Sequence, residues 1–459
     1  MNKVQALLAA LCAVVTLTGS GCGGGGGGIF PPPPPSYTLG GTVKGLAGYG
    51  LMLQNNGANG STIGHAANGI YPDLTGDSLA NGAAYDVTIK TQPANPSQTC
   101  VVTNGMGTIA GANITNIAVT CTTNADRFVY VVNGGSNNIS AYAINAASGA
   151  LTAISGSPFP AGNVPYAIAV DPSGKFAYVA NQGSGNVSAF AIDSTSGALT
   201  PVSGSPFATG PFPFSVAVDP SSRYVYVTNG NSGNVSAYTI NPGSGALTAV
   251  SGSPFAAGNA PYSVSVHPTG NFVYVANGGS NDVSGYTVDT SSGALTAISG
   301  SPFGAGNGPR SVTVDPSGKF AYVANANSNN ISAYTIDVTS GALTAVSGSP
   351  FMAGIVPYSV AVDPFGTFVY VANQVSNSIS AYTIDTSTGA LTAANGSPFP
   401  AGSAPWSLAD PSGKFAYVAN ASSSNVSVYA IDASSGSLTA VNGSPFAAGS
   451  LPYAVAVGH

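Results

Sequence analysis

Residues 169–181 read Ala-Val-Asp-Pro-Ser-Gly-Lys-Phe-Ala-Tyr-Val-Ala-Asn, and variants of this stretch return every 48 residues. The central tyrosine marks the repeat at Tyr130, Tyr178, Tyr226, Tyr274, Tyr322, Tyr370 and, after a one-residue deletion, Tyr417. Seven copies of one unit therefore fill residues 124–459. A repeat of this length, built from short strands, is typical of a β-propeller. The repeat predicts an all-β fold, a seven-bladed β-propeller, before any single residue is considered.

Each unit contains four short apolar stretches, which in the fourth copy are residues 262–266, 272–276, 283–289 and 295–299. Pro-Thr-Gly, Asn-Gly-Gly-Ser and Ser-Ser-Gly separate them, and residues of these types end strands. The unit therefore predicts one blade of four strands. Several of the stretches are apolar on both faces, as expected for a blade covered by a neighbour on each side.

The array begins with the second strand of a unit, at residues 127–133, and ends with a first strand, at residues 453–457. We expect this C-terminal strand to complete the first blade. Such closure removes the exposed sheet edge that an open array would leave. An open solenoid is the alternative, but solenoids usually carry atypical capping units at both ends.

The first 21 residues have the features of an export signal. A lysine precedes an apolar run over residues 4–17, which is too short to span a bilayer as a mature helix. Small residues before Cys22 resemble a bacterial lipoprotein cleavage site, although Gly19 stands where a large aliphatic residue is usual. The pattern predicts a lipid anchor at Cys22 and an outer-membrane or cell-surface location, with Gly23 favouring the outer membrane. Periplasmic release or secretion without a lipid is the alternative.

Two further segments precede the repeats. Residues 22–36 are rich in glycine and proline and predict an extended tether behind the lipid-anchor site. Residues 37–123 show no 48-residue echo and alternate in polarity, which predicts a small β-sandwich-like domain. Cys100 and Cys121 are its two cysteines, and in an exported protein they predict a disulfide. A metal site is a poorer interpretation, because two cysteines without a nearby histidine fall short of a ligand set.

Composition narrows the partners. All 15 acidic residues are aspartate, charged residues make up 5% of the chain, and the net charge is -6. The six lysines and three arginines are scattered and form no basic stripe, so nucleic acid is not an expected partner. We expect contact with a membrane only through the lipid anchor.

The repeats resemble a known family in their most regular residues. Tyr226-Val-Thr-Asn229, its equivalents, and the preceding turn Asp171-Pro-Ser-Gly-Lys-Phe resemble the YVTN-repeat propellers related to the lactonase family. That family includes propeller 6-phosphogluconolactonases and carboxymuconate-type cyclases. The resemblance covers all seven units and implies the fold; it also implies, as a second possibility, lactone hydrolysis.

The catalytic residues implied by that resemblance are mostly missing. The enzymatic branch has Gly-Pro-Arg-His near the start of a middle blade and a glutamate after the following Tyr-Val-x-Asn. Here Gly308-Pro309-Arg310 is followed by Ser311, and Ala326 stands in the place of the glutamate. Acid–base chemistry on a lactone needs a group that titrates near the working pH. The sequence therefore predicts no catalytic residue.

Other titratable residues offer no replacement. His267 takes the place of a turn aspartate in other units, and His65 and His459 lie outside the repeats' regular positions. Aspartates recur after the third strand, but asparagine replaces them at two units, so bonds to the turn backbone explain them better than calcium binding. We expect no metal and no cofactor. The recurring set is Asp193, Asp289, Asp337, Asp385 and Asp432, with Asn145 and Asn241.

A different set follows the proline that begins each first strand. Since first strands line the channel of a propeller, these side chains are expected to form a ring at one mouth, within reach of the Gly-Ser-Pro-Phe loops. Such a ring could stack on a sugar or another ring-shaped ligand, with the arginine pairing with a carboxylate or phosphate. Packing between blades is the alternative explanation. The seven residues are Tyr166, Phe214, Tyr262, Arg310, Tyr358, Trp406 and Tyr453.

Together these observations predict an exported, lipid-anchored propeller that acts as a binding or scaffolding module at the bacterial cell envelope. The expected partner is a carbohydrate, a small anionic ligand or an envelope protein. The alternative is a lactonase-like hydrolase that uses the channel mouth around Arg310.

Overall fold

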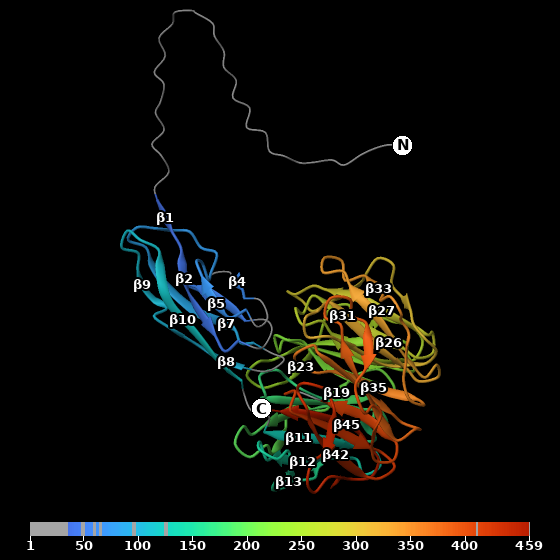
Figure 1. Ribbon diagram of the computed structural model, residues 1–459. Coiled ribbons are helices and arrows are strands. Elements are labelled where there is room, and N and C mark those ends of the chain that lie inside the picture. The colour runs from blue at the N-terminus through green and yellow to red at the C-terminus, as the bar shows by residue number, and fades with distance from the viewer. Residues whose placement is uncertain are drawn as a thin grey trace, which may run out of the picture.

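A computed structural model describes residues 35–46, 51–57, 61–63, 67–93, 98–123, 127–409 and 412–458. These residues form a small β domain beside a ring of β-sheets (Figure 1). The export signal, Cys22, residues 23–34 of the tether, His65 and His459 lie outside the described residues. Among the described residues, no helix is long and apolar enough to cross a bilayer.

The ring consists of seven antiparallel sheets of one pattern, and blade 2 serves as the example. Its strands β15 (Pro165–Val170), β16 (Phe176–Asn181), β17 (Asn186–Ile192) and β18 (Leu199–Pro201) follow one another from the channel outward, and β19 (Phe207–Ala208) also pairs with β17. The fold is therefore the seven-bladed propeller that the repeat predicts.

The other blades have equivalent bounds. They are β20 (Pro213–Val218), β21 (Tyr224–Asn229), β22 (Asn234–Ile240), β23 (Leu247–Ala249) and β24 (Phe255–Ala256); β25 (Pro261–Val266), β26 (Phe272–Asn277), β27 (Asp282–Val288), β28 (Leu295–Ala297) and β29 (Phe303–Gly304); β30 (Pro309–Val314), β31 (Phe320–Asn325), β32 (Asn330–Ile336), β33 (Leu343–Ala345) and β34 (Phe351–Met352); β35 (Pro357–Val362), β36 (Phe368–Asn373), β37 (Ser378–Ile384), β38 (Leu391–Ala393) and β39 (Phe399–Pro400); and β40 (Pro405–Ala409), β41 (Phe415–Asn420), β42 (Asn425–Ile431), β43 (Leu438–Ala440) and β44 (Phe446–Ala447).

The outermost strand of each blade differs from the sequence expectation. It is interrupted, so that a fifth short strand such as β19 continues where β18 stops. The Gly-Ser-Pro-Phe loop forms the interruption, and in blade 2 the Ser205 hydroxyl accepts the backbone N–H of Ala189 at 2.9 Å. These loops therefore lie along the outer edge of the blades, and the expectation that they reach the channel mouth was wrong.

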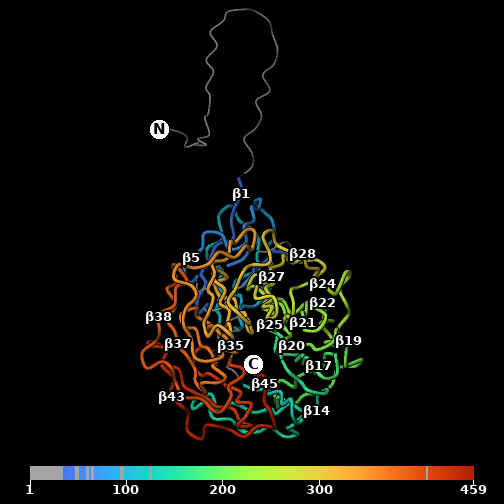
Figure 2. The backbone as a smooth tube through the Cα atoms, turned by 90° about the vertical axis from the view of Figure 1, so that its right-hand side faces the viewer, coloured from blue at the N-terminus to red at the C-terminus, as the bar shows by residue number. Residues whose placement is uncertain are grey.

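The ring is closed by its last strand. Strand β45 (Pro452–Gly458) pairs antiparallel with β11 (Phe128–Asn133), and Val455 lies opposite Val131. Beyond β11, blade 1 continues with β12 (Asn138–Ile144), β13 (Leu151–Ala153) and β14 (Phe159–Pro160). Figure 2 shows the red C-terminal strand among the innermost strands of the ring. This pairing confirms the closure predicted from the two ends of the array and rules out the open solenoid.

A buried tyrosine joins each blade to the next. Tyr130 is fully buried in β11, and its hydroxyl donates to the carbonyl oxygen of Gly197 in blade 2 at 2.9 Å. Gly197 has a φ of 73°, and a Cβ there would lie 2.4 Å from a ring carbon of Phe128. Only glycine fits this conformation and this contact. Five further tyrosines make the same bond over 2.7–3.1 Å, namely Tyr178, Tyr226, Tyr274, Tyr322 and Tyr370.

The asparagine that ends each second strand fixes the following turn. In blade 2 Asn181 is fully buried, and its Nδ2 atom donates to Asn186 Oδ1 and Ser188 Oγ, both at 2.8 Å. Its Oδ1 atom accepts the N–H of Gly162 at 3.1 Å. The asparagine of the Tyr-Val-x-Asn motif is therefore explained by buried hydrogen bonding within the fold.

Acidic turn residues are also structural. Asp193 Oδ1 accepts backbone N–H bonds from Thr195 and Ser196 at 3.0 and 2.8 Å, and Asn145 does the same in blade 1. Hydrogen bonds from Ser434 and Ser435 lower the pKa of the equivalent Asp432 to about 2. The described residues contain no group of three or more His, Cys, Asp or Glu side chains that could hold a metal ion.

His267 occupies a turn aspartate's place with all its polar atoms bonded. Its Nδ1 atom accepts the N–H of Thr269 at 3.1 Å, so Nε2 carries the proton and donates to the Gly318 carbonyl at 2.9 Å. Burial lowers the pKa of this histidine, while the Gly318 bond and the charge of Asp315 partly oppose that effect. The imidazole of His267 is therefore neutral and structural. It follows β25, at the end of that strand that faces away from the channel mouth.

The small domain is a β-sandwich of two four-stranded sheets. One sheet has the order β5-β2-β10-β8 and the other β4-β3-β7-β9, and Leu39, Leu53, Val87 and Val119 pack between them. Strands β1 and β6 pair separately. The strands are β1 (Ser36–Tyr37), β2 (Leu39–Lys44), β3 (Met52–Asn55), β4 (Ser61–Thr62), β5 (Gly69–Tyr71), β6 (Leu79–Ala80), β7 (Ala84–Thr91), β8 (Gln98–Thr103), β9 (Met106–Thr108) and β10 (Ile114–Thr123).

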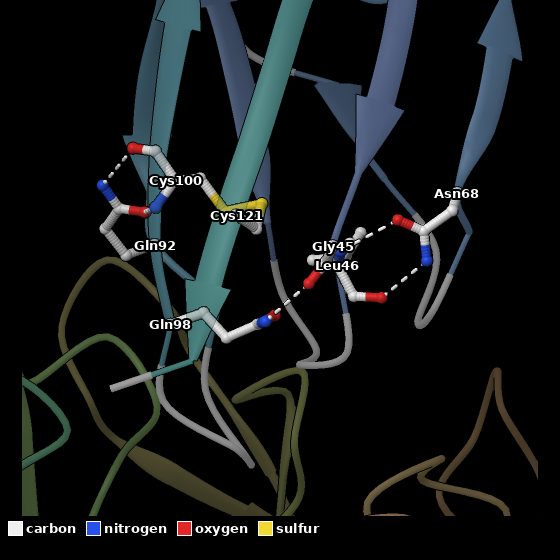
Figure 3. Close-up of a disulfide and its surroundings, with 7 residues drawn as sticks. All are labelled: Gly45, Leu46, Asn68, Gln92, Gln98, Cys100 and Cys121. Carbon is white, nitrogen blue, oxygen red and sulfur yellow. Dashed lines mark hydrogen bonds between the residues drawn. A yellow bond between two sulfur atoms is a disulfide. The ribbon is translucent and has the colours of Figure 1, made fainter. Parts of the chain in front are cut away.

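A disulfide between Cys100 and Cys121 links β8 to β10, as the sequence predicts (Figure 3). Beside it, the Gln92 side chain accepts the Cys100 N–H at 2.7 Å and donates to the Cys100 carbonyl at 3.0 Å. Gln98 donates to the Gly45 carbonyl at 2.8 Å. These bonds connect Gln92 to β8 and the start of β8 to the residue that follows β2.

Removing the closing strand tests the ring. We expect deletion of residues 450–459 to abolish cooperative thermal unfolding, because it exposes the edge of β11 and the apolar side chains that Val455 covers. Circular dichroism during heating measures this, and deletion of residues 1–34 is the matched control, since it leaves every described strand intact. An unchanged melting curve for the C-terminal deletion would contradict a closed ring.

His267 predicts a pH dependence of stability. Its folded pKa lies below the unfolded value of about 6.5, so its contribution to stability is complete above that pH and is lost as the pH falls toward the folded pKa. We expect His267→Asp, which restores the residue of other units, to flatten the decrease in melting temperature between pH 7.5 and 5. Parallel curves for the variant and the parent protein would show that His267 does not titrate in this way.

Candidate functional site

Seven side chains meet at one end of the channel, which we call the mouth face. They are the second residues of the seven first strands, and we call them the collar: Tyr166, Phe214, Tyr262, Arg310, Tyr358, Trp406 and Tyr453. All seven are half-buried.

A backbone irregularity places each collar residue. In every first strand the pairing with the second strand shifts between the proline and the residue two positions later, so the collar residue has no partner. Bulges of this kind redirect a side chain and are common next to functional sites. The residue before the proline has a positive φ in all seven blades, for example 48° at Val164 and 55° at Val356. Such values are unusual for β-branched residues, and only the arginine blade has a glycine there, Gly308.

The collar side chains form a closed circuit of contacts. Adjacent ring centroids lie 4.2–5.2 Å apart from Tyr262 through Phe214, Tyr166, Tyr453 and Trp406 to Tyr358. Arg310 completes the circuit, because its Cζ atom lies 3.8 Å from the ring centroid of Tyr262 and 5.5 Å from that of Tyr358. Stacked and tilted ring pairs at these distances are favourable arrangements.

The residue after the strand-ending asparagine lies against the collar side chain in three blades. Gly134, Gly230 and Gly278 leave room for a ring, and a Cβ there would lie 2.1–2.6 Å from Tyr453, Phe214 and Tyr262, in that order. Gln182 and Gln374 fill the same position beside Tyr166 and Tyr358. These two tyrosines instead meet each other, with their hydroxyl oxygens 2.8 Å apart. Burial raises the pKa of both hydroxyls above the ordinary range.

Arg310 carries unused hydrogen-bonding capacity. Its Nε atom is buried and has no hydrogen bond within the described residues. Trp406 Nε1 is also buried without a hydrogen bond of good geometry there, although it approaches the Tyr166 hydroxyl closely enough to affect that group's pKa. Since most buried polar atoms in proteins are bonded, two such atoms in one small cluster are notable.

Acid–base groups are scarce on this face. The one histidine among the described propeller residues, His267, lies at the opposite end of its strand. Asp282, at the start of β27, is the one carboxylate of these residues on the mouth face. Its Oδ1 atom accepts hydrogen bonds from Asn277 at 2.7 Å and Ser280 at 3.2 Å. Ala326, beside Arg310, is buried and offers no functional group. The mouth can therefore stack on and pair with a ligand more readily than it can move a proton.

Sequence reasoning found the seven collar residues but missed what shapes them. The signal was present as departures from the repeat: Gln182 and Gln374 in place of Gly or Ala, Gly308 in place of a larger residue, and Asp282 in place of Asn or Ser. The effect of these substitutions depends on which side chains face each other across the channel. The repeat alone does not reveal which ones do.

Solved structures share this fold. A Bacteroides uniformis protein designated a 6-phosphogluconolactonase aligns with a TM-score of 0.64 at 20% identity, over 73% of this chain and 100% of that one. A Bacteroides fragilis protein with the same designation gives 0.64 at 20% identity, over 74% and 99%. The periplasmic gluconolactonase of Pseudomonas aeruginosa gives 0.62 at 20% identity, over 72% and 99%. At these identities the likeness shows the fold alone.

No curated protein matches the chain in sequence. The family model "Lactonase, 7-bladed beta-propeller" matches residues 91–211, 251–356 and 351–455, which together are well over half of the chain. The chain therefore belongs to the lactonase family of seven-bladed β-propellers.

Proposed function

We propose that this protein is an exported, non-enzymatic binding module whose collar takes a ring-shaped ligand bearing one anionic group. The observation that carries the proposal is Arg310, whose guanidinium lies between the rings of Tyr262 and Tyr358 and whose Nε atom is buried without a hydrogen bond in the described residues. Held between two rings, the guanidinium has little freedom, so less entropy is lost when it binds a carboxylate or phosphate.

The aromatic members supply the remaining contact. The half-buried rings around the arginine leave part of their apolar surface exposed, and a sugar ring can pack against it. Charge-assisted hydrogen bonds from a guanidinium are about twice as strong as neutral ones. One such group in an aromatic surround therefore supports recognition of a single anionic substituent on a ring.

Hydrolysis is the second candidate, and the family membership favours it. The three structural neighbours named above are designated as lactonases, and Arg310 retains the Gly-Pro-Arg context of the enzymatic branch. Against it stands the chemistry of the mouth face, because Asp282 is held by Asn277 and Ser280, and the places of the expected histidine and glutamate hold Ser311 and Ala326. A general base must lie within hydrogen-bond reach of the proton that it removes.

Binding and catalysis can be separated with two probes. We expect glucose 6-phosphate to bind and to change the fluorescence of Trp406, the single tryptophan of the chain, while 6-phosphogluconolactone decays no faster than in buffer. Arg310→Tyr, which installs an aromatic residue as in the other six blades, is expected to weaken binding roughly 10–100-fold, the equivalent of 1.5–3 kcal/mol. Fluorescence titration and a lactone-hydrolysis assay are the measurements.

Trp406→Tyr serves as the matched control, because it keeps an aromatic ring and Arg310, and calorimetric titration should show little change in its affinity. Lactone turnover that disappears in Arg310→Ala would replace the binding proposal with hydrolysis. Equal affinity of the parent protein and Arg310→Tyr for glucose 6-phosphate would remove the collar as the binding site.

We also propose export and lipid anchoring through Cys22. The sequence of residues 1–22 supports this, and the Cys100–Cys121 disulfide suits an oxidising compartment. Export and the proposed binding function fit together, since an anchored module holds its ligand at the cell envelope.

The anchor predicts a clear fractionation result. In a bacterial host that processes lipoproteins, the protein should partition into the detergent phase, and Cys22→Ala should move it to the aqueous phase because the acyl chains are lost. Cys22→Ser in a second sample controls for side-chain size. Detergent partitioning that both variants retain would show that Cys22 is not the anchor.

A further inference from the structure

A pocket lies on the face of the propeller opposite the collar, where the small domain covers the ring. It has a volume of about 540 Å³, within the range typical of ligand sites, and such sites are common between domains. Met52, Thr62, Ile63, Thr91 and Gln92 line it from the small domain. The turns between the first and second strands of blades 3, 4 and 5 line it from the propeller.

The turns beneath this pocket depart from the repeat. Blade 2 has Asp171-Pro-Ser-Gly-Lys-Phe, whereas blade 3 has Asp219-Pro-Ser-Ser-Arg-Tyr. Tyr224 is the only tyrosine at a position that is phenylalanine in the other six units, and Ser222 replaces glycine although its φ is 56°. In blade 4, Thr269 and Asn271 replace the serine and lysine of blade 2. These departures of blades 3 and 4 lie under the small domain, and blade 6 also departs from the pattern, with Phe365 and Thr367.

Arg223 and Tyr224 form a rigid pair in the pocket wall. Arg223 Nη1 and the Tyr224 hydroxyl each donate to the Thr290 carbonyl at 3.0 Å, and Arg223 Nη2 donates to the Tyr224 hydroxyl at 3.0 Å. Both guanidinium bonds end on neutral oxygen atoms, so neither is an ion pair, and the charges of Asp219 and Asp289 act on the same Tyr224 hydroxyl. Among the residues that the structure describes, only two of the five N–H donors of the guanidinium are bonded, so three remain for a ligand.

A second depression continues from the first. It measures about 500 Å³, shares Ser221, Arg223 and Tyr224 with the pocket, and is lined further along by Lys175. Asp171 and Asp219 also line this surface, but their oxygens accept hydrogen bonds from their own turns. An elongated ligand could therefore pass Arg223 and reach Lys175.

We propose that this interdomain groove binds an acidic oligosaccharide. The Thr62 hydroxyl and the Asn271 amide match sugar hydroxyls, and Arg223 and Lys175 offer cations to the carboxylates of an acidic sugar chain. This site lies on the opposite face from the collar and does not depend on the function proposed for it.

Trigalacturonate is the probe, and uncharged maltotriose is its matched neutral analogue. We expect the full chain to bind trigalacturonate by calorimetry without a change in Trp406 fluorescence, because that residue is at the other end of the channel. Arg223→Lys with Tyr224→Phe, which restores the residues of blade 2, should weaken binding at least tenfold. The same positions in blade 7, changed in the opposite sense as Lys414→Arg with Phe415→Tyr, should leave the affinity unchanged.

Thermal melting of each variant shows whether the fold is kept, and both double variants carry residues that the repeat already tolerates. The proposal fails if trigalacturonate does not bind, if maltotriose binds equally well, or if the blade 3 variant keeps the parent affinity. Binding that changes Trp406 fluorescence or is lost in Arg310→Tyr would place the ligand at the collar and would also overturn the groove. Failure of glucose 6-phosphate to bind leaves this test unaffected.

Discussion

The hydrogen bond from a buried tyrosine to a glycine carbonyl of the next blade is the constraint on which the ring depends. It recurs in six blades, and each hydroxyl is removed from water, so losing its acceptor would leave a buried donor unpaired. Burial accordingly raises the pKa of Tyr130 far above its ordinary value. At the seam Phe415 packs over Gly149 as Phe128 packs over Gly197, so the seventh interface follows the same pattern. The tyrosine and the glycine of each unit are therefore retained in all seven copies, because the contacts between blades require them.

Because the scaffold is repeated, function is best sought where the repeat breaks. At the mouth, glutamines replace small residues in the two blades whose tyrosines, Tyr166 and Tyr358, meet across the channel, and one arginine replaces an aromatic residue. On the opposite face, Tyr224 stands where the other six units have Phe, and Arg223 stands where blades 2, 5 and 7 have Lys. Each of these substitutions changes the polar groups at the surface but leaves the Tyr–Gly contacts between blades intact, because it lies at a strand end or in a turn.

Family membership and local chemistry point in different directions. The fold belongs to the lactonase propellers, yet the mouth combines aromatic stacking with a cation and keeps its one described carboxylate bonded to Asn277 and Ser280. A propeller holds its strand ends in place whatever side chains they carry. The side chains at the strand ends can therefore differ between family members without disturbing the fold.

The sequence by itself determined the blade number, the closing strand, the disulfide and the membership of the collar, because each depends on periodicity or on counting residues. It also predicted that the recurring Asp and Asn residues serve turns. Only the tertiary structure decided that the Gly-Ser-Pro-Phe loops lie on the outer edge, that Tyr166 meets Tyr358, and that the small domain covers blades 3 to 5. Those facts depend on residues far apart in the sequence, 192 positions in the case of Tyr166 and Tyr358. A repeat specifies what each unit contains but not which units face one another.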